Sequence, residues 1–185
     1  MAPPDSDELL FDARLARIDL DELTRYIVRH HHDYVRRITP EVTGWLETLI
    51  ATDGERHPEL PHVRSIFASL ADELHGNMIK EESILFPYID LMAATRRLGD
   101  PLPSGPFGTI LNPIRMMAAV HRACLDRLAM LRRLSQDYVP PPDADTTYRR
   151  CIAELARFDA ALRQYVHLED HVLFPRAIEL EQQLG

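Results

Sequence analysis

Aliphatic side chains recur three and four positions apart along most of this 185-residue chain, and only seven glycines interrupt the pattern. This spacing is typical of amphipathic helices, because residues three and four apart lie on one helix face. We expect long helices over about 20–38, 62–86, 112–137 and 146–174, separated by the loops 54–61, 97–111 and 140–142. The predicted fold class is therefore all-α, an up-and-down four-helix bundle with short extra helices.

Prolines mark the expected helix ends. Thr39-Pro40 predicts an N-cap followed by proline at the first position of a second, shorter helix, so the chain is expected to break there. Pro87 is expected to end the second long helix, and Pro175 to kink or stop the last one.

One motif occurs twice. The segment from Glu81 to Pro87 reads EESILFP, and 88 residues later the chain reads EDHVLFP from Glu169. A histidine precedes each copy at nearly the same distance, His32 by 49 residues and His121 by 48. Two histidines and two glutamates, each on a different helix of a bundle, are the type of ligand set that holds one or two iron or manganese ions.

Two buried carboxylates would be costly without a partner, since an isolated buried carboxyl group protonates rather than remain charged. Cations, arginines or strong hydrogen-bond donors could stabilise them. The alternative to a metal site is therefore a metal-free polar core in which Arg36 or Arg115 neutralises the two glutamates.

Four segments resemble a known family. These are IVRHHH at 27–32, MIKEESILFP at 78–87, the stretch 113–121, and HLEDHVLFPRA at 167–177. Together they are similar to the hemerythrin-like (HHE cation-binding) domain, most closely to the di-iron proteins that repair iron–sulfur centres. The resemblance covers roughly residues 19–178. It implies a non-heme iron centre, expected to hold two ions, with manganese as the other metal and a metal-free site as the remaining alternative.

The resemblance also implies the ligands. The family's pattern matches His32, Glu81, His121 and Glu169, which makes the glutamates the expected bridging ligands and the histidines the expected terminal ligands.

Three family histidines are replaced in this chain, by Asp53, Asn77 and Tyr165. Each replacement offers an oxygen, so all three are candidate ligands of a more anionic site that would favour ferric iron or manganese and discourage reversible oxygen carriage. Asn77 is also interpretable as a hydrogen-bonded core amide, and Tyr165 as a core phenol. Asp53 would lie about 31 Å from His32 along one continuous helix, so it reaches the site only if the chain turns back at Thr39-Pro40.

Other motifs have simpler interpretations. His167 and His171 are four residues apart, but both lie about 200° around the helix from Glu169, so a surface position is expected. The two Leu-Phe-Pro triplets are interpreted as core and helix-end signals, and Cys124 as a small core residue.

Composition narrows the function classes. The formal charge of −8 argues against nucleic acid as a partner. Two cysteines without CxxC spacing do not form a disulfide framework, and neither a secretory signal nor an 18-residue apolar run is present, so a cytoplasmic protein without a membrane partner is expected. Residues 1–18 are interpreted as an acidic, poorly ordered leader and 19–185 as the bundle domain.

Three functions remain as hypotheses. The first is a non-heme iron protein that reacts with oxygen, peroxide or nitric oxide in redox stress defence or iron-centre repair. The second is an oxygen-dependent oxidoreductase acting on a small organic substrate at a retuned site. The third is a metal-free bundle that binds a ligand or protein. The expected partners are a diatomic ligand or small molecule, with a homodimer as a further expectation.

Overall fold

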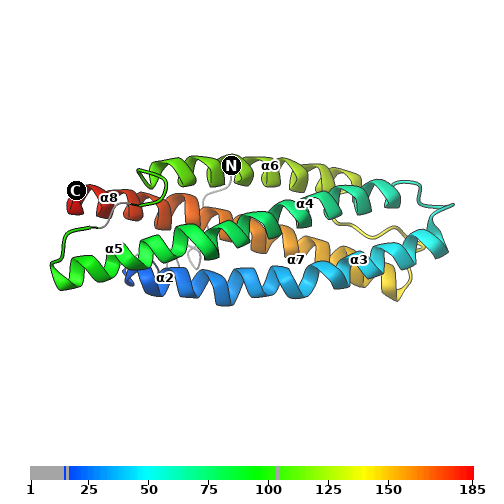
Figure 1. Cartoon of the computed structure of the whole chain (residues 1–185). Helices are drawn as coiled ribbons and strands as arrows, with labels where there is room; N and C mark the ends of the chain where they lie inside the picture. Colours follow the sequence, from blue (N-terminus) through cyan, green and yellow to red (C-terminus); the bar gives the residue numbers. More distant parts are fainter. Residues whose placement is uncertain (1–14, 16, 103–104) are drawn as a thin grey trace.

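A computed structural model describes residues 15, 17–102 and 105–185 of the chain. Every regular element in these residues is helical, and the helices form four long rods (Figure 1). The elements are α2 (Leu20–Ile27), η1 (Val28–His32), α3 (Asp33–Asp53), α4 (Leu60–Lys80), η2 (Glu81–Leu85), α5 (Phe86–Leu98), α6 (Leu111–Leu134), α7 (Thr146–Leu168), η3 (Glu169–Leu173) and α8 (Phe174–Leu184), where η denotes a π-helical turn.

Three of the rods contain a π-helical turn between two α-helices: α2–η1–α3, α4–η2–α5 and α7–η3–α8. The fourth rod is α6 alone. The first rod packs on the second and on α7, and α6 packs on α4 and α7, which closes the bundle. This arrangement confirms the predicted all-α four-helix bundle. Most of the leader predicted at 1–18 lies outside the described residues.

The predicted break at Thr39-Pro40 is wrong, because α3 runs without interruption through Pro40. Thr39 does not cap a helix; its hydroxyl donates to the Val35 carbonyl 3.0 Å away, within the same helix. Pro40 lacks an N–H and leaves the Arg36 carbonyl without its helical donor. Arg36 is exposed, so water can satisfy that carbonyl and the helix continues.

The expected helix ends at Pro87 and Pro175 are also wrong, since α5 and α8 continue both rods past these prolines. The physical reason is the π-helical turn that precedes each proline. The Phe86 N–H donates to the Glu81 carbonyl five residues back, and the Phe174 N–H likewise donates to the Glu169 carbonyl. A widened turn changes the carbonyl register and accommodates a proline ring that would clash with an ordinary α-helical turn.

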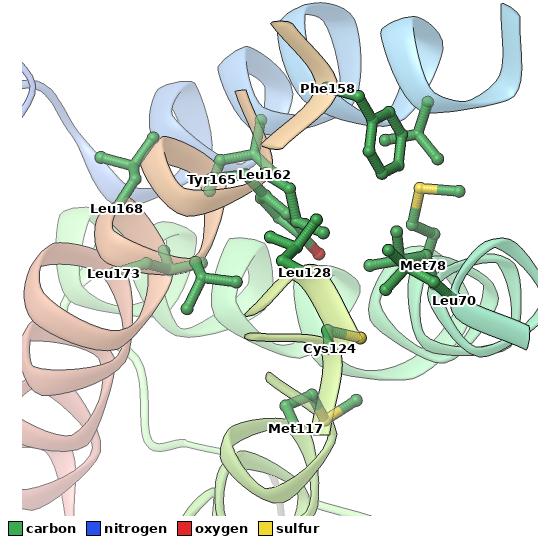
Figure 2. Packing of buried hydrophobic residues seen from close by; sticks show 14 of the residues in the cluster. Leu70, Met78, Met117, Cys124, Leu128, Phe158, Leu162, Tyr165, Leu168 and Leu173 are labelled. Carbon is green, nitrogen blue, oxygen red and sulfur yellow. The ribbon is translucent and has the colours of Figure 1, made fainter. Parts of the chain in front are cut away.

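The bundle interior is lined by apolar side chains from all four rods. Figure 2 shows residues of α4, α6 and α7 meeting in this core, with Tyr165 of α7 reaching into its middle. Both cysteines are buried and free. The apolar positions form stripes rather than continuous surfaces, and none of the described helices has the length and apolarity that a bilayer crossing requires.

Phe158 should be a major contributor to the stability of this core. Its ring is 1% exposed and meets Phe67 edge-on at 5.2 Å between centroids. Replacing a buried phenylalanine by alanine removes apolar contact and leaves a cavity. We expect Phe158→Ala to lower the free energy of unfolding by about 3–5 kcal/mol in urea denaturation.

The matched control is Leu98→Ala, because Leu98 is 74% exposed. This variant should stay within about 0.5 kcal/mol of the parent protein. Equal losses for the two variants would contradict the packing described here.

Candidate metal centre

The π-helical turns supply three of the four side chains in a polar cluster at the middle of the bundle. His32 is the last residue of η1, Glu81 the first of η2 and Glu169 the first of η3. His121 comes from the middle of α6. All four are 0% exposed. Segments far apart in the sequence thus bring two imidazoles and two carboxylates together, as the repeated motif predicts.

Each glutamate faces the histidines across short distances. His32 Nε2 lies 3.3 Å from Glu81 Oε2, and His121 Nε2 lies 3.1 Å from Glu169 Oε2. The second oxygen of Glu81, Oε1, lies 3.9 Å from His121 Nε2. Ligand atoms of His32, Glu81 and Glu169 also lie within 4.8 Å of one another. Glu81 therefore presents one oxygen to each histidine, which is the placement a bridging carboxylate needs.

The electrostatics of the cluster favour bound positive charge. Burial and the nearby charge of Glu81 raise the pKa of the Glu169 carboxyl group. Burial opposes the positive charge on His121, but the Asp170 and Glu169 carboxylates outweigh it and raise its pKa. The pKa of His32 is raised in the same way, by Glu81 against the effect of burial. The cluster thus holds protons, which are the charge that a metal cation would replace.

A second acidic residue holds each histidine from behind. His32 donates its Nδ1–H to Glu82 at 2.6 Å, and His121 donates its Nδ1–H to Asp170 at 2.7 Å. A proton held on Nδ1 leaves Nε2, the nitrogen that faces the glutamates, as the one able to bind a metal ion. Outer carboxylates of this kind orient metal-binding histidines and raise their basicity.

The phenylalanine of each Leu-Phe-Pro triplet also positions a histidine. Phe86 stacks on His32, with centroids 5.7 Å apart and an angle of 13° between the rings. Phe174 stacks on His121 at 5.8 Å and 6°. The interpretation of these triplets as core and helix-end signals is therefore incomplete. Each phenyl ring also fixes the plane of an imidazole in the cluster.

Asn77 and Tyr165, two of the three replacements, lie at the cluster. Asn77 donates its side-chain N–H to Glu81 Oε1, and the Tyr165 hydroxyl donates to Glu81 Oε2 at 2.7 Å. Burial, with the charges of Glu169 and Glu81, raises the pKa of Tyr165 well above its usual value, so the phenol holds its proton. In this arrangement both side chains act as hydrogen-bond donors to one glutamate.

Asp53, the third replacement, is not brought to the cluster. It is the last residue of α3, and its carboxylate pairs with Arg56, which also pairs with Asp143. The uninterrupted helix from His32 separates the two residues by about 31 Å. The sequence interpretation that placed Asp53 at the site depended on a chain reversal at Pro40, and the structure contradicts it.

The arginines proposed for a metal-free core do not neutralise the two glutamates. Arg36 pairs with Glu82 and with Asp33, both outside the cluster. Among the described residues, no arginine makes an ion pair with Glu81 or Glu169.

Buried polar atoms that make no hydrogen bond show whether the cluster could bind a metal ion. Six buried side-chain polar atoms in the described part of the chain have no hydrogen-bond partner, and four of them belong to this cluster: Nε2 of His32, Nε2 of His121 and both carboxylate oxygens of Glu169. Buried polar atoms are rarely left without a hydrogen bond, so their concentration here fits a site that binds a cation. The nitrogen and oxygen donors, without sulfur, suit iron or manganese.

A surface groove of about 290 Å³ lies on the His32 side of the cluster and is lined by residues of α2, η1, η2 and α5. Val28, Phe86 and Pro87 form apolar parts of its wall, and Glu82 and Asp90 add carboxylates. Glu82 and Phe86 are also the residues that contact His32. One shell of side chains therefore separates this groove from the cluster.

His31, the neighbour of His32 in η1, is also buried. It is 7% exposed, and its ring stacks on Tyr165 at 5.6 Å. Burial and the neighbouring histidines lower its pKa to about 4, so this imidazole is neutral. The three consecutive histidines lie within η1, and the sequence offers no signal that this turn is π-helical.

The outer carboxylates did leave a signal in the sequence. In both copies of the motif an acidic residue follows the glutamate directly, Glu82 after Glu81 and Asp170 after Glu169. The repetition of that second acid is the feature that could have predicted its role.

Comparison with known proteins identifies the family to which the chain belongs. No protein-family model matches the chain. The iron–sulfur cluster repair protein YtfE of Yersinia pseudotuberculosis serotype IB is 31% identical over 163 residues, which cover 88% of this chain and 67% of that protein. YtfE of Yersinia pestis, strain Pestoides F, matches with the same identity and coverage. With this similarity and the bundle described above, the chain belongs to the YtfE family of hemerythrin-like proteins.

Proposed function

We propose that this protein carries a non-heme iron centre of two ions and acts in the repair of iron–sulfur clusters under redox stress. The observation that carries the proposal is the buried cluster of His32, Glu81, His121 and Glu169, with four of its donor atoms unpaired. The relatives are named for iron–sulfur cluster repair, which supports the repair function for this chain.

The positions of the donors support two ions rather than one. His32 and His121 face different oxygens of Glu81, so each histidine has its own carboxylate oxygen nearby. Glu169 supplies the remaining acid, closest to His121. Two ions, one beside each histidine, would share the glutamates and balance their charge.

Each side chain has a definite task in this proposal. His32 and His121 would hold the iron through Nε2, while Glu82 and Asp170 retain the Nδ1 protons and fix the ring orientation. Tyr165 and Asn77 fix Glu81 through its two oxygens. When bound, iron supplies one-electron chemistry and affinity for oxygen, peroxide or nitric oxide.

Having fewer protein ligands would suit a repair protein. Four ligating side chains leave more coordination positions to solvent or small ligands than the seven that the family resemblance implies. Ions held by fewer protein donors are also released more readily. Under this proposal, the protein would react with diatomic molecules at the open coordination positions. It would also release iron for the rebuilding of iron–sulfur clusters.

Anaerobic reconstitution tests the proposal directly. Untagged protein is incubated with Fe²⁺, desalted and analysed for iron, and is then added to an iron–sulfur enzyme whose cluster has been damaged by nitric oxide. We expect two iron ions per chain and recovery of that enzyme's activity. A protein that retains no iron would contradict the metal centre, and one that retains iron without restoring activity would contradict the repair function alone.

Glu81→Gln should lower the iron content sharply. The amide preserves the shape of the side chain but removes the charge that both proposed ions share. Elemental analysis after desalting measures the loss, and circular dichroism checks the fold. Glu41→Gln, at an exposed position on α3, serves as the matched control and should retain all of its iron. Equal iron in the two variants would remove Glu81 from the centre.

Asp170→Asn should weaken iron binding without abolishing it. The amide holds the His121 Nδ1–H less strongly, and loss of such an outer partner typically lowers metal affinity by about 10–100-fold. Competition with a coloured iron chelator measures the change. Asp126→Asn, on the same helix as His121, is the control. An unchanged affinity in Asp170→Asn would show that the 2.7 Å contact has no such role.

Tyr165→Phe should retain its iron, because the hydroxyl acts as a hydrogen-bond donor to Glu81. The ferric form of the parent protein should accordingly lack the visible charge-transfer band of a phenolate bound to iron. A band that is present in the parent and absent in Tyr165→Phe would instead make Tyr165 a ligand.

A further inference from the structure

A second pair of histidines lies outside the centre. His167 is in the last turn of α7, and His171 is in η3, four residues further along. Their ring centroids are 4.7 Å apart, with an angle of 49° between the ring planes. His171 is exposed and His167 is half-buried, so the pair is open to solvent.

The separation of the two rings suits chelation of one ion. A metal ion binds an imidazole nitrogen at about 2.0–2.1 Å. Two imidazoles on one ion then have centroids on the order of 5 Å apart, close to the observed value. Histidines four residues apart on one helix face are also the spacing by which helical HExxH motifs bind zinc. Each ring needs only one nitrogen for the ion, so its other nitrogen can keep a hydrogen bond.

The neighbouring cation is held elsewhere. Arg163 lies one turn before His167, and its guanidinium binds Asp159, a buried carboxylate further back along α7. Asp159 also pairs with Arg132. Because Arg163 points away along the helix, its charge does not lie between the two imidazoles.

We propose that His167 and His171 form a second, surface site for a divalent transition-metal ion. Two imidazoles and water favour metals late in the first-row series, so Cu²⁺ and Zn²⁺ should bind more tightly than Fe²⁺ or Mn²⁺. This pair offers imidazole nitrogens, whereas the centre proposed for iron also offers carboxylates.

Calorimetric titration of the iron-loaded protein with Zn²⁺ tests the site. The parent protein should bind one Zn²⁺ beyond its iron, without losing iron. His167→Ala and His171→Ala should each lose that equivalent and keep the parent's iron content. His62→Ala, which removes a lone exposed histidine of α4, should bind Zn²⁺ as the parent does.

A spectroscopic measurement identifies the ligands. With one equivalent of Cu²⁺, the electron paramagnetic resonance spectrum should show hyperfine coupling to two imidazole nitrogens, and His171→Ala should abolish this signal. Equal Zn²⁺ binding by the parent and by the His167→Ala, His171→Ala double variant would overturn the proposal. If the core bound no iron and took up Zn²⁺ instead, the parent would still bind one Zn²⁺ more than the double variant, because both proteins share the same core.

Discussion

Two glutamates without exposed surface lie at the centre of this bundle, and the rest of the structure depends on how their charge is balanced. Glu81 and Glu169 lie near each other in a medium of low dielectric, where uncompensated carboxylates would protonate. No arginine among the described residues pairs with them. Protons shared with the two histidines balance this charge in the absence of a metal. Metal cations can balance it as well, which is consistent with the four donor atoms of the cluster that make no hydrogen bond.

The bundle achieves this placement with local distortions rather than with irregular loops. Three π-helical turns carry three of the four cluster residues, and such turns frequently occur at functional sites. Each turn rotates its acid or imidazole relative to the regular helix on either side. Two phenylalanines and two outer carboxylates then fix the imidazoles from behind, in nearly the same way in both halves of the molecule.

The two halves differ in how the glutamates are held. Both oxygens of Glu81 accept hydrogen bonds, from Asn77 and Tyr165, whereas the Glu169 carboxylate is in ion-pair contact with His121, whose Nε2 lies 3.1 Å from Oε2. Glu81 is therefore held by two neutral donors, and Glu169 by an imidazole. The two donors to Glu81 are the amide and the phenol at the positions where the family resemblance implies histidines.

The sequence predicted much of this architecture, and its errors have physical causes. Periodicity and the repeated motif were sufficient for the four rods and for the convergence of His32, Glu81, His121 and Glu169. The helix ends predicted at prolines were wrong. Pro40 lies at an exposed position inside α3, and Pro87 follows a π-helical turn, so both rods continue past these residues. The misplacement of Asp53 followed from the first of these errors. Stacking of Phe86 on His32 could not be predicted, because it depends on ring orientation across two rods.

Anomalous X-ray scattering from crystals of the iron-loaded protein, recorded on both sides of the iron absorption edge, tests the central claim most directly. The account predicts two iron peaks inside the bundle, one beside Nε2 of His32 and one beside Nε2 of His121, with Glu81 and Glu169 between them. A bundle interior without anomalous density, in which those four side chains bond only to each other and to water, would contradict it.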